Sequence, residues 1–66
     1  MDRSKIAERL VKLRGKRTQA EVAEAIRVSP SAYSMYETGE RIPRDEIKIR
    51  IAKYYGRTVN TIFYAD

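Results

Sequence analysis

Apolar residues near the start of the chain recur with the spacing of one helical face. Ile6, Leu10 and Leu13 stand at positions i, i+4 and i+7, which is the pattern of an amphipathic α-helix. Gly15 follows them, and glycine often ends a helix because it adopts the left-handed backbone conformation without strain. The pattern therefore predicts a first helix from about Ser4 to Leu13.

The segment from Thr18 to Gly39 predicts two short helices joined by a tight turn. Thr18 is followed three residues later by Glu21, which is the spacing of a capping box at a helix start. Ser29 is a second cap residue, and Pro30 follows it at the first helical position, where its missing N–H costs nothing. Apolar side chains share one side of each helix: Val22, Ala23 and Ile26, then Tyr33 and Tyr36.

The stretch Ile47–Ile51 alternates apolar and basic residues in the manner of a β-strand. We predict a helix instead, because Pro43 followed by Asp45 and Glu46 is typical of a helix start, with acids near the positive end of the helix dipole. The sequence also offers no second strand for this stretch to pair with. Within the helix, Glu46 and Arg50 would form an i,i+4 ion pair.

A last short helix is predicted after Gly56. Thr58 would cap it, and the helix would contain Val59, Ile62 and Phe63. All the predicted elements are helices, so we expect an all-α fold, and we expect residues 1–66 to form one domain.

Composition narrows the range of functions. The chain has 66 residues without cysteine or histidine, so it lacks disulfides, the commonest general base and the commonest metal ligand. We expect no enzyme activity, no metal and no cofactor. No apolar run reaches membrane length, and the first ten residues do not show the apolar core of a signal peptide, so we expect a cytoplasmic, nucleoid-associated protein. Fourteen basic against nine acidic residues give a net charge of +5, which favours binding to polyanions such as nucleic acid.

The two capped helices also fit the spacing of a helix-turn-helix motif. That motif needs apolar residues at set positions, so that its helices pack at a wide angle and the second enters a major groove. With Gln19 as the first position, the fifth is Ala23, which is small enough for a close helix crossing. The fourth, eighth, tenth, fifteenth and eighteenth positions are all apolar: Val22, Ile26, Val28, Tyr33 and Tyr36.

Further residues, from the first predicted helix to the last, match the pattern of one known family: Leu13, Arg14, Thr18, Gln19, Glu21, Val22, Ala23, Val28, Ser29, Tyr36, Glu37, Gly39, Pro43, Ile51, Ala52, Ile62 and Phe63. On these residues the chain resembles the Cro/CI-type (lambda-repressor-like, XRE) helix-turn-helix regulators of bacteria and phages. The resemblance implies a compact five-helix fold. It also implies a transcriptional regulator, most often a repressor, that binds double-stranded operator DNA as a two-fold homodimer.

The resemblance further implies roles for individual residues. Gln19 would touch a DNA phosphate and brace the recognition helix, and Arg41 and Arg44 would contact the DNA backbone. Arg14 and Glu37 would form a structural ion pair between the first helix and the end of the third. The full expected set of DNA contacts is Arg17, Thr18, Gln19, Ser29, Pro30, Ser31, Ser34, Met35, Arg41 and Arg44.

Four positions depart from the family pattern. Arg27 stands where the turn usually has a glycine in the left-handed conformation, and Tyr33 carries a hydroxyl that needs a hydrogen-bond partner. Pro30 and Met35 replace side chains that often hydrogen-bond to bases. Because the expected DNA-facing side of the third helix has no Arg, Asn or Gln, we expect few direct base contacts and more weight on phosphates, DNA shape and water.

Several alternatives remain open from the sequence. The serines and Met35 also fit an ordinary solvated helix face, and the basic residues of the contact set also fit plain solvated charge. Ile49 points away from the buried side of its helix, where it would be either harmless or part of a dimer interface with Phe63 and Tyr64. The same fold also serves as an antitoxin or a protein-interaction module, for which the partner would be a toxin or an antirepressor protein.

Overall fold

Helices make up the regular secondary structure of residues 1–65, which are the residues that the computed structural model describes. No strand occurs among these residues, so the predicted all-α fold is confirmed, and Ile47–Ile51 lies in a helix as expected. No helix within residues 1–65 combines the length and the apolar character needed to cross a membrane. In chain order the helices are α1 (Arg3–Arg14), α2 (Gln19–Ile26), α3 (Pro30–Thr38), α4 (Asp45–Tyr55) and the short η1 (Asn60–Tyr64).

The predicted caps of α2 and α3 are both present. The Oγ1 atom of Thr18 accepts the backbone N–H of Glu21 at 3.0 Å, and the Oγ atom of Ser29 accepts the N–H of Ala32 at 3.0 Å. Pro30 occupies the first turn of α3. Each hydroxyl satisfies a backbone donor that has no partner inside its helix, so local sequence is enough to set where these two helices begin.

Helix α1 begins one residue earlier than predicted, at Arg3. The carboxylate of Asp2 accepts the backbone N–H groups of Ser4 at 2.9 Å and Lys5 at 3.3 Å. Aspartate is among the strongest N-cap residues, so this cap extends the helix toward the N-terminus. At the other end Gly15 follows the last helical residue, as the sequence predicts.

One predicted contact on α4 is replaced by another. Arg50 was expected to pair with Glu46, but its Nη1 atom donates to the backbone carbonyl of Ile26 at 3.3 Å. Helix α4 packs against α2, and Ile26 is the last residue of α2. The carbonyl groups at a helix C-terminus lack intrahelical partners and carry partial negative charge, so they attract the guanidinium.

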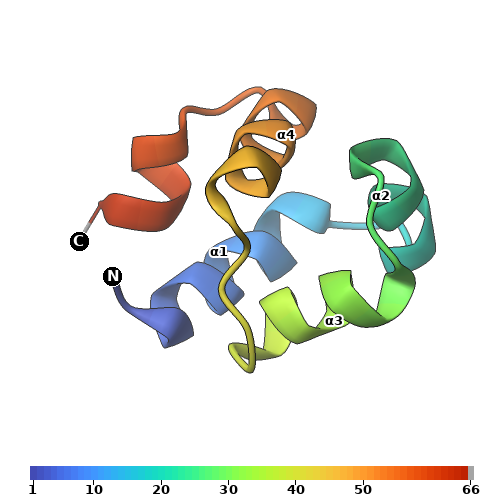
Figure 1. The fold of residues 1–66 in the computed structure, drawn as a ribbon, viewed down its shortest axis with the longest axis horizontal. Helices are drawn as coiled ribbons and strands as arrows, with labels where there is room; N and C mark the ends of the chain where they lie inside the picture. Colours follow the sequence, from blue (N-terminus) through green and yellow to red (C-terminus); the bar gives the residue numbers. More distant parts are fainter. Residues whose placement is uncertain (66) are drawn as a thin grey trace.

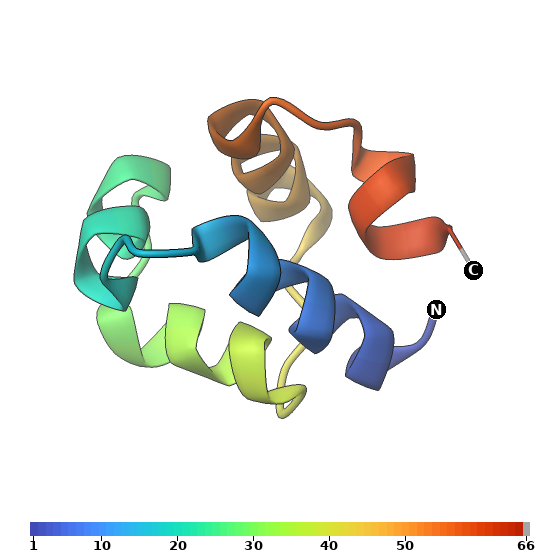
Figure 2. The same cartoon turned by 180° about the vertical axis from the view of Figure 1, so that it is seen from behind.

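The helices surround a single apolar core. Figures 1 and 2 show α2 and α3 at one end of the molecule, and η1 and both chain termini at the opposite end. Helix α1 packs against α3 and η1, while α2 packs against α3 and α4. The buried side chains of the core are Ile6, Leu10, Val22, Ala23, Ile26, Tyr33, Tyr36, Ile47, Ile51, Ala52, Tyr55, Ile62 and Phe63.

The hydroxyl of Tyr33, which was expected to need a partner, has one inside the core. Tyr33 is fully buried, and its hydroxyl lies 2.7 Å from that of Tyr55. Burial and this hydrogen bond raise the pKa of Tyr33 above its ordinary value, so the neutral hydroxyl is kept. The pair joins α3 to α4 without leaving an unsatisfied polar group in the core.

The expected surface role of Phe63 is wrong. Phe63 is only 1% exposed, because η1 turns this side chain into the core and leaves Tyr64 outside. Arg9 on α1 holds η1 in this orientation, since its guanidinium donates to the backbone carbonyls of Ile62, at 2.8 Å, and Ala65.

Candidate nucleic-acid interface

Helix α3 has one buried side and one open side. Tyr33, Tyr36 and Glu37 are buried against the rest of the molecule. The open side carries small or flexible side chains that leave the helix free to approach a surface. These are the expected DNA-facing residues of α3, with Pro30 and Ser31 exposed and Ser34 and Met35 half-buried.

Thr38 extends the open side of α3 by another turn. It was not among the residues expected from the sequence to face DNA. It stands four residues after Ser34 and three after Met35, which places it on the same helical face. Its side chain is exposed, and its hydroxyl donates to the carboxylate of Glu40 at 2.9 Å. The i+4 spacing is the signal that would have found it.

The turn between α2 and α3 keeps the left-handed conformation although its residue is not glycine. Arg27 has φ 63° and ψ 48°, and its N–H bonds to the carbonyls of Ala23 and Glu24. Val28 donates to the carbonyl of Ala23 at 3.0 Å, which completes a common helix-ending motif. The turn therefore has the geometry expected of the family. A residue other than glycine in this conformation costs about 1 kcal/mol, so Arg27 is strained.

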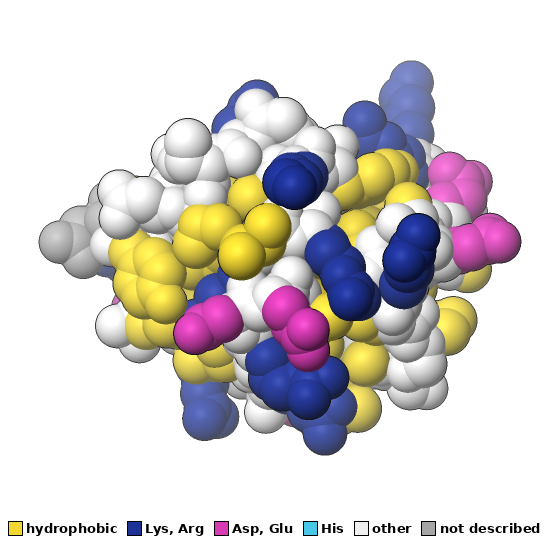
Figure 3. Space-filling model, turned by 45° about the horizontal axis from the view of Figure 1, so that its top comes forward, with side chains coloured by type: hydrophobic (Ala, Val, Ile, Leu, Met, Phe, Trp, Pro, Cys, Tyr) yellow, Lys and Arg dark blue, Asp and Glu magenta, His cyan; other side chains and the backbone are white. Residues whose placement is uncertain are grey.

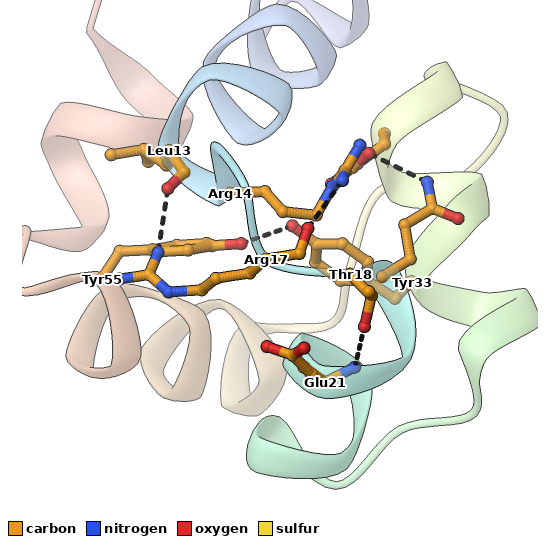
Figure 4. Close-up of polar contacts among 9 residues, drawn as sticks. Leu13, Arg14, Arg17, Thr18, Glu21, Tyr33 and Tyr55 are labelled. Atoms are coloured by element: carbon orange, nitrogen blue, oxygen red, sulfur yellow. Dashed lines mark hydrogen bonds and ion pairs between the residues drawn. The ribbon is translucent and has the colours of Figure 1, made fainter.

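Glu37 braces the open helix from its buried side. Its Oε2 atom accepts a bond from Nε of Arg14 at 2.8 Å, and its Oε1 atom accepts a bond from Nε2 of Gln19 at 2.9 Å. These partners lie at the end of α1 and the start of α2, and Figure 4 shows Arg14 reaching between the helices. The carboxylate therefore fixes α3 relative to both of its neighbours.

The charge state of Glu37 follows from these contacts. Burial alone raises the pKa of Glu37, but the hydrogen bonds from Arg14, Gln19 and Tyr33 outweigh it and lower the pKa below its usual value. The same hydrogen bond raises the pKa of Arg14. Both groups are therefore charged at neutral pH, and the ion pair expected between them is present.

Arg17 makes contacts within the fold that the sequence did not predict. Its Nη1 atom donates to the backbone carbonyl of Leu13 at 3.0 Å, and its guanidinium stacks 5.3 Å from the ring centre of Tyr54 and 5.6 Å from that of Tyr55. Figure 4 shows this side chain lying alongside Tyr55. These contacts join the end of α1 to α4, but the side chain stays exposed, so the expected DNA contact of Arg17 remains a prediction.

The other expected backbone contacts lie at the surface. Thr18 is exposed at the start of α2, and Gln19 beside it is half-buried. Arg41 and Arg44 are exposed in the loop between α3 and α4. Arg44 approaches Glu46 at 3.5 Å, but both side chains are largely exposed, so water screens this ion pair and it holds the arginine weakly.

Two successive helices are joined here by a tight turn, and the second is held on its buried side by Glu37 and open on its outer side. This is the arrangement of a helix-turn-helix DNA-binding protein. The helix-turn-helix family model matches residues 5–62. The chain belongs to this family, in its Cro/CI (XRE) type, and its lambda-repressor-like fold is that of a DNA-binding regulator. No curated protein and no solved structure matches the chain.

Proposed function

We propose that this protein is a sequence-specific transcriptional repressor that binds a pseudo-palindromic operator as a homodimer. Helix α3 of each subunit enters a major groove, and the two grooves lie about 34 Å apart on one side of the duplex. The observation that carries the proposal is the open side of α3. It is lined by Ser31, Ser34 and Met35, and Glu37 holds the helix rigidly from behind.

The residues divide into two kinds of contact. The hydroxyls of Ser31 and Ser34 meet base edges, and Met35 meets a thymine methyl group. Backbone contacts come from both flanks of α3, and they position the helix without selecting a sequence. The proposed backbone contacts are Arg17, Thr18, Gln19, Ser29, Arg41 and Arg44, and Pro30 packs at the helix start in the groove.

The homodimer contact is proposed on α4 and η1. Ile49 and Tyr64 are each 48% exposed, and hydrophobic side chains form a patch over this part of the molecule in Figure 3. Lys48 holds Tyr64 in place, because its Nζ atom donates to the tyrosine hydroxyl at 3.0 Å and lies 5.0 Å from the ring centre. An exposed aromatic side chain that is held in place, on the same part of the molecule as an exposed isoleucine, is typical of an interface.

A salt titration tests the DNA-binding part of the proposal. Affinity for a duplex that spans two half-sites should fall linearly with the logarithm of salt concentration, because binding releases counterions from phosphates. Arg41→Ala should weaken binding to every sequence and lower the slope by about one. Arg57→Ala is the control, since Arg57 is an exposed basic residue outside the interface. An affinity that does not change with salt concentration would refute the proposal.

A protein-interaction module is the second candidate, and the exposed pair Ile49 and Tyr64 supports it. In that case the patch would bind a toxin or an antirepressor instead of a second copy. Light scattering after size exclusion separates the two functions. A dimer that binds DNA supports the repressor, whereas a monomer that ignores DNA and forms a stable complex with one protein supports the module.

A further inference from the structure

A hollow lies beside the proposed DNA-contacting side of α3. It is open to solvent, has a volume of about 630 Å³ and lies between the turn after α2, one flank of α3, the loop before α4 and the first turns of α4. None of the residues expected on the DNA-facing side of α3 lines it. The volume falls within the range of about 300–1,000 Å³ that is usual for small-molecule sites.

Positive charge surrounds this hollow. Four arginines line it, at positions 27, 41, 44 and 50, against a single acid, Glu46. Glu46 lies 3.5 Å from Arg44. Within residues 1–65, no acidic side chain forms an ion pair with Arg27, Arg41 or Arg50. Figure 3 shows basic side chains around exposed hydrophobic atoms on this face of the molecule.

The floor of the hollow is apolar and aromatic. Tyr36 and Ile47 form part of it and are 5% and 4% exposed. Val28, Ala32 and Ile42 complete it, and all three are half-buried. An apolar floor under a rim of arginines suits a ligand that has a flat or apolar body and a charged group at one end.

The backbone of one of these arginines and the guanidinium of another have fixed positions at the edge of the hollow. Arg27 keeps a left-handed backbone conformation at φ 63°, which glycine would adopt without strain. Strain of this kind persists where a side chain is needed for function. Arg50 is tied by its Nη1 atom to the carbonyl of Ile26, so its guanidinium is pre-positioned at the edge of the hollow.

We infer that this hollow binds a small phosphate ester with an apolar or aromatic body. Arginine presents several N–H donors in a planar fork that matches phosphate geometry, and several arginines around one site suit a doubly charged group. The apolar floor would take the body of the ligand. Arg27 and Arg50 would contact the phosphate from one side, and Arg41 and Arg44 from the other.

Occupancy of the hollow should weaken DNA binding. Arg41 and Arg44 belong both to the hollow and to the proposed backbone contacts, so the two ligands compete for the same guanidinium groups. Each would lower the affinity for the other by the same factor. This competition rests on the proposed function, whereas binding of the phosphate ester itself does not.

An NMR titration of the ¹⁵N-labelled chain tests the inference. Adenosine 5′-monophosphate serves as the probe, and adenosine without the phosphate is the ligand control. The nucleotide should shift the amide signals of Val28, Ile42 and Ile47 at millimolar concentration, and adenosine should shift them far less. Arg27→Gly and Arg50→Gln should each weaken nucleotide binding about tenfold, as loss of a charge-assisted hydrogen bond predicts.

Arg57→Gln is the matched protein control, because it removes one exposed positive charge outside the hollow. It should leave the nucleotide affinity within about twofold. Absence of shifts in the hollow, or shifts that all three variants reduce equally, would overturn the inference.

A second titration with a DNA duplex separates the two sources of phosphate. If the duplex shifts the amide signals of the hollow and the nucleotide does not, the hollow takes DNA backbone phosphates and the small-ligand site is wrong. If the nucleotide binds and the duplex leaves the amide signals of α3 unchanged, the small-ligand site is supported and the proposed DNA function is wrong.

Discussion

At the scale of single residues, Glu37 does the most to hold the interface together. Its carboxylate joins the end of α1 to the start of α2 through Arg14 and Gln19, and it lies on the buried side of α3, the helix that we propose enters the DNA groove. The family resemblance predicted its pairing with Arg14. The bond from Gln19 was expected only as a general brace, because its acceptor depends on how α2 and α3 cross in three dimensions.

The lowered pKa of Glu37 makes stability depend on pH. Its ordinary value in an unfolded chain is about 4.3, and its folded value lies below that. The carboxylate therefore contributes stability that is fully present above the unfolded pKa and is lost as the pH falls through the folded pKa. Urea unfolding between about pH 6 and pH 2 should show this loss. In Glu37→Gln the free energy of unfolding should depend less on pH over this range. If it falls with decreasing pH as steeply as in the wild type, Glu37 is not the group responsible.

The strain at Arg27 predicts a substitution that stabilises the fold. Arg27→Gly should raise the free energy of unfolding by about 1 kcal/mol, because glycine adopts the left-handed conformation freely. Ala25→Gly is the matched control, since Ala25 is an exposed residue inside α2 and glycine there should cost about 1 kcal/mol. Chemical denaturation of both variants checks this. A fold weakened by Arg27→Gly would contradict it.

At the scale of helices, local signals predicted most of the boundaries. Thr18 and Ser29 were found because a cap and its helix lie within a few residues of each other. The helix at Ile47–Ile51 was predicted from its start signal, because its alternating pattern alone favours a strand. The partner of Arg50 was missed, since the carbonyl of Ile26 reaches it only through the packing of α4 on α2.

Substitutions of two serines at the start of α3 should differ in their effect on stability. Ser29→Ala removes the cap of α3 and should lower the free energy of unfolding by about 1 kcal/mol. Ser31→Ala changes an exposed side chain two residues later and should leave stability within about 0.5 kcal/mol. Thermal unfolding followed by circular dichroism measures both. Equal losses in the two variants would contradict the cap assignment.

At the scale of the whole molecule, the sequence predicted which residues are apolar but not always where they lie. Phe63 was expected outside and is buried, because the orientation of η1 is set by Arg9, which is distant in sequence. The arginines of the hollow were not recognised as a group for the same reason. They come from a turn, a loop and a helix that meet only in the folded chain.

The proposed dimer gives a further prediction at this scale. Ile49→Lys should convert the dimer to a monomer in light scattering, because it places a charge at the centre of the contact. Val11→Lys is the control, since Val11 is similarly exposed, at 45%, but lies on α1. The circular dichroism spectrum should stay helical in both. A dimer that survives Ile49→Lys would remove α4 from the interface.

The central claim is that the open side of α3 selects the DNA sequence. Selection of bound duplexes from a randomised pool tests it most directly, with the wild type compared against Ser31→Ala, Met35→Ala and Arg41→Ala. We expect the first two variants to change the preferred sequence. Arg41→Ala should weaken binding while keeping that preference. If Ser31→Ala and Met35→Ala both return the wild-type sequence, this side of α3 does not contact bases and the claim is wrong.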